Sequence, residues 1–199
     1  MNIYKGTKMK KVVLSALLVI LFSAIITAQV SYSFDKYHAR LSFSAYHLGI
    51  SYVEGIFKSF DATFISSKKD FTDAQIEMSA DLKSINTEVE MRDNDLRQNW
   101  FEVDKYPGLT FKSTSFRKVD TRNYKLTGNI TIHGVTKLIT FDVVYNGKAQ
   151  NPYSKKYSHG FTVTGKLDRS DFGIGKETIP TVSFKIGLKS NVEFVINGN

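Results

Sequence analysis

Four histidines are the residues of this 199-residue chain best suited to acid–base or metal chemistry. None of them forms an HxH or HxxxH pair, so a zinc site would need ligands from separate strands. The chain contains no cysteine, which excludes a disulfide framework, a thiolate nucleophile and any cysteine-ligated metal. It also lacks GxSxG, GxGxxG and GxxxxGK[ST] motifs, which catalytic serines and nucleotide phosphates use. We therefore expect no catalytic residue, no metal site and no cofactor.

His47 is the histidine with the most informative position. It ends a stretch in which Leu41, Phe43 and Ala45 alternate with polar residues, and it shares their parity. Residues of one parity lie on one face of a strand, so we expect His47 to face an apolar interior near a strand end. Three roles remain open for it: a structural histidine bonded to the backbone, a contact to the polar head group of a ligand, or a general base.

The other three histidines carry less information. His133 directly precedes Gly134 between two alternating segments, and we interpret it as a turn residue rather than a ligand contact. His38 and His159 are expected in loops.

A short helix is predicted between two long strands. Glu90 stands three residues after Thr87, the spacing of a capping box with Thr87 as the N-cap. The acidic residues of this segment are better explained as the solvated face of a short helix than as a glycosidase carboxylate pair. Trp100 and Phe101 follow the helix, where they either plug the interior or line a pocket.

The segment Arg92–Arg97 is a second candidate for ligand chemistry. One interpretation is that Arg92 and Asp93 form a salt bridge that anchors the helix to the rim of the fold. The other is that Arg92 or Arg97 contacts an anionic head group, because guanidinium groups pair well with carboxylates and phosphates.

The elements that would position these residues are strands, and the clearest are at 126–147. Leu126, Gly128, Ile130 and Ile132 have one parity, and polar residues lie between them. After the turn, Phe141 and the apolar residues that follow it continue the same alternation. Alternation of this kind is typical of antiparallel strands with one buried and one wet face.

Strand-like alternation recurs along the rest of the chain, at 41–47, 53–57, 74–82, 109–116, 161–167, 182–188 and 192–196. About eight strands joined by turns predict an all-β fold, either an antiparallel sandwich or a barrel. Glycines within strands, such as Gly55, Gly128 and Gly165, favour the barrel because they often mark bends or close approaches.

The N-terminus is predicted to be a cleaved signal peptide at 1–28. Four lysines precede an apolar run at 12–26, which is shorter than the roughly 20 residues of a spanning helix. We expect cleavage after Ala28, export to the periplasm or the medium, and no stable membrane span afterwards. The 27 basic residues less these four lysines leave 23 against 19 acidic residues, a net charge of +4. This mild charge predicts no nucleic-acid partner.

Four blocks of the chain, in order, together resemble the YceI-like family. The first is 35–57, with the pattern D-x-x-H-x-x-L-x-F-S-x-x-H-L-G-I-S. The other three are 92–97 with 100–114, 126–137 and 169–174. The chain departs from the family pattern at four positions: Asp95 replaces a histidine, Trp100 a phenylalanine, Leu138 a proline and Ala39 a serine.

The resemblance implies an eight-stranded antiparallel, lipocalin-like extended β-barrel at 29–199, with the short helix between two strands. It also implies a long apolar cavity that holds a polyisoprenoid or fatty-acyl amphiphile without catalysis. Parity and the aromatic pair after the helix give the expected cavity residues: Phe43, Ala45, His47, Phe57, Ile76, Trp100, Phe101, Phe111, Ile130, Phe141, Phe161 and Val163.

His47 and Arg92 are the candidates for contact with a head group. Two alternatives to lipid binding remain, an enzyme that acts on an amphiphile or its head group, and a structural β domain without a ligand. The sequence leaves the oligomeric state open, including a homodimer.

Overall fold

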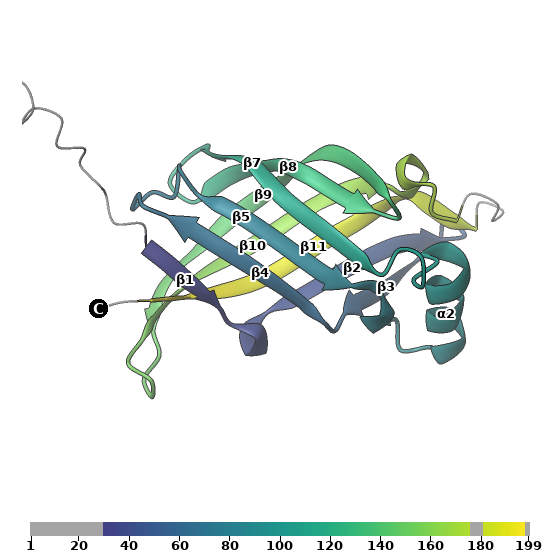
Figure 1. Cartoon of the computed structure of the whole chain (residues 1–199), viewed down its shortest axis with the longest axis horizontal. Helices are drawn as coiled ribbons and strands as arrows, with labels where there is room; N and C mark the ends of the chain where they lie inside the picture. The colour runs from purple at the N-terminus through teal and green to yellow at the C-terminus, as the bar shows by residue number, and fades with distance from the viewer. Residues whose placement is uncertain (1–29, 176–180, 198–199) are drawn as a thin grey trace, which may run out of the picture.

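The protein is an antiparallel barrel drawn out along one axis (Figure 1). The structure is a computed structural model that describes residues 30–175 and 181–197. The predicted signal peptide at 1–28 lies outside these residues. The strands are β1 (Val30–Phe34), β2 (Arg40–His47), β3 (Ser51–Phe57), β4 (Phe60–Ser66), β5 (Gln75–Asp81), β6 (Ile85–Asn86), β7 (Gly108–Lys118), β8 (Asn123–Ile132), β9 (Val135–Gln150), β10 (Tyr157–Asp168) and β11 (Val182–Ile196).

Eight of these strands form a closed ring, which confirms the predicted eight-stranded antiparallel barrel. They follow one another in the order β1, β4, β5, β7, β8, β9, β10 and β11, and β11 pairs with β1 again. Closure leaves no free edge along the ring.

The long strand β11 changes partners along its length. Its C-terminal end pairs with β1, from Phe194 to Ile196. Its N-terminal part pairs with β2 instead, between Val182 and Asn191. β2, β3 and β6 therefore extend the wall beyond the ring at the opposite end of the barrel from β1 (Figure 1).

The helical segments are short. They are η1 (Lys36–His38), η2 (Leu82–Ser84), α2 (Glu90–Asp95), η3 (Leu96–Trp100) and η4 (Arg169–Phe172). α2 lies beside β3 at the end of the barrel opposite β1 (Figure 1), so the predicted short helix is confirmed. Among the described residues, no helix combines the length and the apolar character that crossing a bilayer requires.

The hairpin of β8 and β9 has the predicted alternation. Leu126, Gly128, Ile130 and Ile132 are all buried, and the residues between them are partly or fully exposed. The turn is His133–Gly134, with φ of 52° and 75°. Two consecutive positive φ angles match the right-handed twist of a hairpin. His133 is therefore a turn residue, as its position before Gly134 indicates.

Several predictions about individual segments were wrong. β1 and β4 were not expected as strands, and 182–188 and 192–196 form one continuous strand. His159 lies within β10 rather than in a loop. The capping box is absent, because α2 has Val89 as its N-cap without a side-chain bond. The hydroxyl of Thr87 donates instead to the buried carboxylate of Asp93, at 2.6 Å.

Candidate functional site: the cavity at the helix end of the barrel

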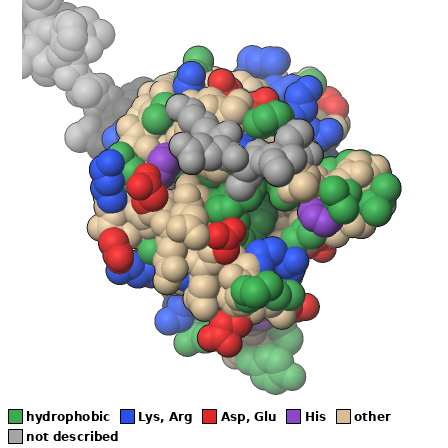
Figure 2. Space-filling view, turned by 90° about the vertical axis from the view of Figure 1, so that its right-hand side faces the viewer, with side chains coloured by type: hydrophobic (Ala, Val, Ile, Leu, Met, Phe, Trp, Pro, Cys, Tyr) green, Lys and Arg blue, Asp and Glu red, His purple; other side chains and the backbone are tan. Residues whose placement is uncertain are grey.

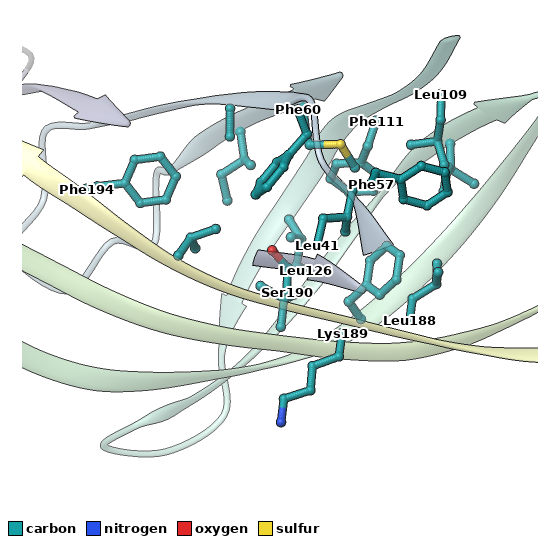
Figure 3. A pocket seen from close by; sticks show the side chains of 17 residues that line it. Leu41, Phe57, Phe60, Leu109, Phe111, Leu126, Leu188, Lys189, Ser190 and Phe194 are labelled. Carbon is teal, nitrogen blue, oxygen red and sulfur yellow. The ribbon is translucent and has the colours of Figure 1, made fainter. Parts of the chain in front are cut away.

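The interior of the barrel contains an apolar cavity in two adjoining parts. The inner chamber, shown in Figure 3, has a volume of about 90 Å³. The outer chamber has a volume of about 420 Å³ and lies at the end that carries α2. Phe57, Leu109 and Leu188 line both chambers, so the two chambers adjoin at these side chains.

The inner chamber is lined almost entirely by hydrocarbon. Its walls include Leu41, Phe111 and Leu126 (Figure 3). Lys189 also borders it, but its side chain points away from the cavity (Figure 3) and is exposed. The chamber therefore offers burial to an apolar chain and no partner to a polar group.

The opposite end of the barrel is filled by aromatic rings. Phe64 is 2% exposed, and its ring centroid lies 5.0–5.6 Å from four neighbouring rings. The cluster, which we call the aromatic plug, comprises Tyr32, Phe64, Phe71, Tyr145, His159, Phe161 and Phe194. Edge and tilted ring contacts of this kind pack densely, so the interior is closed at this end.

Glycines in the strands give the neighbouring phenylalanine rings room to lie against the wall. A Cβ on Gly55 would lie 2.3 Å from the ring of Phe43. A Cβ on Gly165 would lie 2.4 Å from the ring of Phe141. Since carbon atoms cannot approach so closely, any larger residue would push these two rings from their places, and both rings line the cavity.

The mouth of the outer chamber has a hydrogen-bonded polar wall on the helix side. Arg92 donates from Nε to the Thr87 hydroxyl at 2.8 Å and from Nη2 to the Thr87 carbonyl at 2.9 Å. The carboxylate of Asp93 accepts the Thr87 amide at 2.8 Å. The helix is thus anchored to the rim through Thr87, and the predicted Arg92–Asp93 salt bridge is not formed among the described residues.

Arg97 lines neither chamber. Its guanidinium donates to the Lys83 and Ile85 carbonyls and to the Asn94 side chain, at 2.8–3.0 Å. These bonds hold η3 against η2 and β6.

Arg169 is the buried cation of the mouth, at 2% exposure. Its guanidinium donates to the Ile174, Gly175, Val182 and Ser183 carbonyls at 2.8–3.2 Å. Its Cζ atom also lies 4.9 Å from the centroid of the Trp100 ring. Desolvation lowers the pKa of Arg169. Arg169 therefore ties η4, the start of β11 and the ring of Trp100 into one rim.

His47 and Asp95 complete the polar part of the mouth. Both line the outer chamber. The imidazole of His47 has no hydrogen bond to any of the described residues. The alternative of a structural histidine that bonds the backbone therefore receives no support. Asp95 accepts a hydrogen bond from Asn99 at 2.7 Å and is exposed.

The remaining histidines have structural partners outside the cavity. His133 bonds the Glu102 carboxylate at 2.7 Å and the Phe172 carbonyl at 3.1 Å. His159 bonds the Tyr145 hydroxyl at 2.8 Å within the aromatic plug. Burial, with a contribution from Lys148, lowers the pKa of His159.

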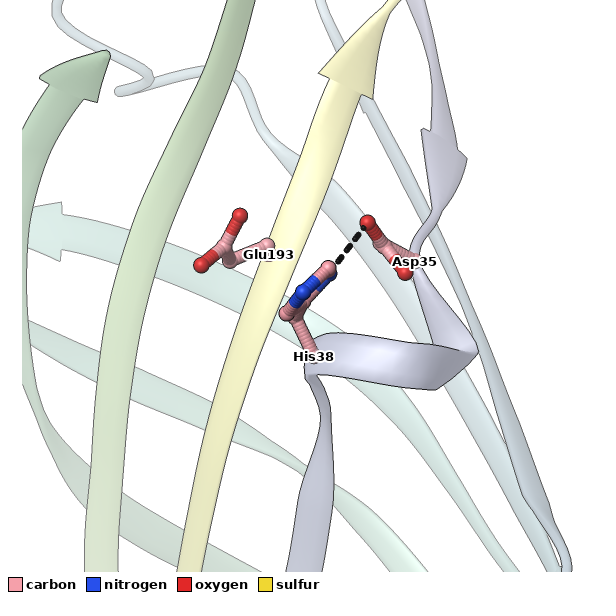
Figure 4. A group of neighbouring side chains, drawn as sticks. All are labelled: Asp35, His38 and Glu193. Carbon is pink, nitrogen blue, oxygen red and sulfur yellow. Dashed lines mark hydrogen bonds and ion pairs between the residues drawn. The ribbon is translucent and has the colours of Figure 1, made fainter. Parts of the chain in front are cut away.

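One group of side chains in the described part of the chain has metal-like spacing. Ligand atoms of Asp35, His38 and Glu193 lie within 4.8 Å of one another (Figure 4). Asp35 is the N-cap of η1 and accepts the Tyr37 amide at 3.0 Å, and it bonds His38 at 2.9 Å. These bonds stabilise the turn between β1 and β2, so the positions of Asp35 and His38 are explained without an ion.

Most of the residues selected from the sequence border the cavity. Phe57, Ile76, Phe111, Ile130, Phe141 and Val163 line the inner chamber. Phe43, Ala45, His47, Phe57, Arg92, Trp100 and Phe101 line the outer chamber. Phe161 lines neither chamber, because it is 3% exposed and packs within the aromatic plug. Whether the others contact a ligand stays a prediction.

Other cavity residues were missed. Phe60 and Ala62 lie on β4 and line the inner chamber, and their alternation with polar residues was the available signal. Arg169 was not selected as a cavity residue, and no pattern in the sequence indicates its burial.

Known proteins resemble this chain over almost the same residues that form the barrel. The YceI-like domain family matches residues 32–196. Protein YceI of Escherichia coli is 34% identical over 179 residues, which cover 88% of this chain and 92% of that protein. The YCEI protein of Campylobacter jejuni has a solved structure with a TM-score of 0.68 and 34% identity, covering 77% of this chain and 90% of its own.

A more distant structure shares the fold. It is a polyisoprenoid binding domain from Saccharophagus degradans implicated in plant cell wall breakdown. The TM-score is 0.59 at 13% identity, over 84% of this chain and 99% of that domain.

Proposed function

This chain belongs to the YceI-like domain family, and on that premise we propose that it binds and carries a long-chain amphiphile of polyisoprenoid or fatty-acyl type. The observation that carries the proposal is the two-part cavity, closed at one end by the aromatic plug and polar only at its mouth. A polyisoprenoid binding domain of the same fold supports the class of ligand. The far end of the tail would occupy the inner chamber, the rest of the tail would lie in the outer chamber, and the head group would lie near His47 and Arg92.

The energetics favour a long chain over a small apolar molecule. A buried methylene contributes about 0.8 kcal/mol, so a ten-carbon tail offers roughly 8 kcal/mol before costs. Association takes several kcal/mol back, and micromolar affinity requires about 8 kcal/mol net. A tail longer than ten carbons, or a bound head group, supplies the difference. The outer chamber, at about 420 Å³, has the size of ordinary ligand pockets.

We propose a binding role without catalysis. The exposed acids of α2 and the anchored guanidiniums of the rim form no nucleophile and base pair. His47 is the residue that an enzyme would use, because its imidazole lines the chamber without a hydrogen bond among the described residues. His47→Ala should therefore leave the fold intact and change ligand affinity only. A pH-dependent turnover of a bound amphiphile that this variant abolishes would favour the enzyme instead.

Export is part of the proposal. The lysines and the apolar run before residue 29 have the pattern expected of a signal peptide, and the carrier would act in the periplasm or the medium. Microsequencing of the protein recovered from the periplasmic fraction should find Gln29 as its first residue. A retained Met1 in the cytosolic fraction would contradict this.

Solvent extraction of the purified protein, followed by mass spectrometry, tests the binding function. We expect one long-chain amphiphile per chain. Ala45→Trp places a large ring in the outer chamber, where Ala45 is 8% exposed, and should abolish recovery. Ala149→Trp is the matched control, because Ala149 is exposed on β9. An empty wild type that also fails to bind added prenyl or acyl chains would refute the proposal and favour a structural β domain.

A further inference from the structure

The hairpin of β2 and β3 carries two large aliphatic side chains into solvent. Leu48 and Ile50 are in its three-residue turn, at 57% and 77% exposure. Leu48 has φ of 51°, a conformation that is unfavourable for a bulky residue. An exposed leucine in this conformation does not stabilise the turn, so we interpret the exposed tip as a contact surface for another molecule.

Two tyrosines form the next layer behind the tip. Tyr46 and Tyr52 are directly opposite each other on the outer face of the hairpin. Their ring centroids are 4.7 Å apart, and they are 37% and 70% exposed. Tyrosine combines an apolar ring with a polar hydroxyl, which suits the boundary between an apolar medium and water.

Two lysines lie next to the tyrosines, Lys185 in the bulge of β11 beside Tyr46 and Lys166 further from the tip. Lys166 and Lys185 border one shallow groove with Tyr46 and Tyr52, and Glu54 lies in the same groove. Both lysines are exposed. Lys166 pairs with Gly187, which pairs with Ser44, two residues further from the tip than Tyr46.

From the tip inward, the order is the aliphatic side chains, then the tyrosine pair with Lys185 beside it, and then Lys166. Two residues along a strand span about 6.7 Å. The spacing between the layers is therefore comparable to the depth of the bilayer interface between acyl chains and head groups. Apolar side chains enter the acyl region, aromatic rings lie at the interface and cations meet anionic head groups. A protein partner would need a broad face of about 800 Å², and a three-residue tip does not provide one.

We propose that the β2–β3 tip docks the barrel on a bilayer surface that contains anionic lipid. The proposal rests on the proposed carrier function, since a long-chain ligand would be collected from a membrane or delivered to one. The inner face of the same hairpin supplies Ala45, His47 and Val53 to the outer chamber. Docking by this tip would therefore place the mouth of the cavity next to the lipids.

The surface around the mouth agrees with this orientation. Figure 2 looks onto this end and shows hydrophobic side chains in the hollow and a further hydrophobic group at the edge of the face. Met91 on α2 and Val89, the N-cap of this helix, are 81% and 42% exposed. These two residues give the docked molecule a second apolar contact on the helix side of the mouth.

Vesicle flotation of the mature protein tests the proposal. The vesicles contain equal parts of phosphatidylcholine and phosphatidylglycerol, or phosphatidylcholine alone. Leu48→Asn with Ile50→Ser removes the tip, and asparagine tolerates the positive φ. We expect at least about tenfold weaker binding to the anionic vesicles. Lys166→Gln with Lys185→Gln should cost about fivefold per lysine on the anionic vesicles only.

The matched control removes two exposed apolar side chains at the other end of the barrel. Val119 and Tyr153 are 52% and 93% exposed in the β7–β8 and β9–β10 turns. Val119→Ser with Tyr153→Ser should bind vesicles like the wild type. Equal binding by the tip variant and the wild type would overturn the proposal. So would a tip variant whose only change, measured by ultracentrifugation, is loss of a dimer, which would assign the tip to a second copy of this chain.

Ligand binding is measured separately on the same proteins. Extraction of the tip variant should still yield the amphiphile when the ligand is supplied in detergent. A wild type that binds vesicles but contains no ligand would contradict the carrier function and leave the docking surface standing. A wild type that holds the ligand but does not float would contradict the docking surface alone.

Discussion

The two ends of the barrel differ in how their interior is used. At the β1 end, the closed ring of eight strands surrounds the aromatic plug, and Phe64 is 2% exposed. At the α2 end, β2, β3 and β6 extend past the ring and surround an outer chamber of about 420 Å³. One end buries its side chains against each other, and the other leaves space between them.

This difference separates stability from binding. Dense ring packing contributes to the free energy of unfolding, whereas unfilled apolar space forgoes such contacts and is available to a ligand. The plug should therefore determine stability, and the mouth should determine affinity. Substitutions at each end test whether the two properties are separate.

The largest effect is expected in the plug. Phe64→Ala removes a ring that contacts Tyr32, Phe71, Phe161 and Phe194. It should lower the free energy of unfolding by about 3–5 kcal/mol, measured by urea denaturation, and the folded fraction should bind ligand normally. Tyr153→Ala, at 93% exposure, is the control and should change stability by less than about 0.5 kcal/mol. A loss of ligand affinity in Phe64→Ala with an unchanged free energy of unfolding would contradict the assignment of stability to the plug.

The rim should show an effect on both properties. Arg169→Met leaves four backbone carbonyls without their donor and removes the support of Trp100. We expect a loss of about 2–4 kcal/mol in stability and weaker ligand binding by isothermal titration. Arg169→Lys should not restore either property, because one ammonium group cannot reproduce the planar fork of donors. Full rescue by lysine would contradict the account of the rim.

The wall of the inner chamber should show a smaller cost and a change in selectivity. Gly165→Ala brings a methyl group against the ring of Phe141, which should cost about 1–3 kcal/mol and move the ring toward the chamber. Competition assays with a series of acyl chains should then favour shorter chains. In Gly108→Ala the nearest atom lies 3.7 Å from the new Cβ, so this control should keep the wild-type preference. The same preference in both variants would contradict the proposed position of the tail.

The smallest effect concerns pH at the plug. Burial lowers the pKa of His159 below its ordinary value of 6.5, so the unfolded chain binds a proton more readily. Stability should fall as the pH drops through 6.5 toward the folded pKa, and His159→Gln should remove this decline. Asp35 raises the pKa of His38, so the stability that His38 contributes is lost as the pH rises. This contribution is the same in the wild type and in the variant. Thermal melts between pH 5 and 8 compare the two, and parallel curves would contradict this role of His159.

The sequence predicted the side-chain alternation better than the partners of the strands. Ile130, Phe111 and Phe141 face the interior as their parity indicates, because a period of two fixes the face of a strand. The exchange of β11 between β1 and β2 depends on distant pairings that no local pattern encodes. Phe161 has the right parity, but the side chains at its level of the barrel decide whether it packs in the plug or lines a chamber.

Polar side chains were the hardest to place from the sequence. Thr87 and Glu90 have capping-box spacing, yet Thr87 bonds the buried Asp93 and the helix begins at Glu90 without it. Arg169 is buried because four carbonyls from η4 and β11 converge on it. Such a convergence arises from tertiary structure and has no signature in a single segment.

Quenching of the single tryptophan reports which end of a bound amphiphile lies in the outer chamber. Trp100 is the only tryptophan in the chain, and it lines the outer chamber. A long fatty acid brominated near its carboxyl group should quench Trp100 strongly, and the same acid brominated near the far end of its tail should quench weakly, because that end lies in the inner chamber. Equal quenching by both acids, or none by either at saturating ligand, would contradict binding with the tail inward through the helix end of the barrel.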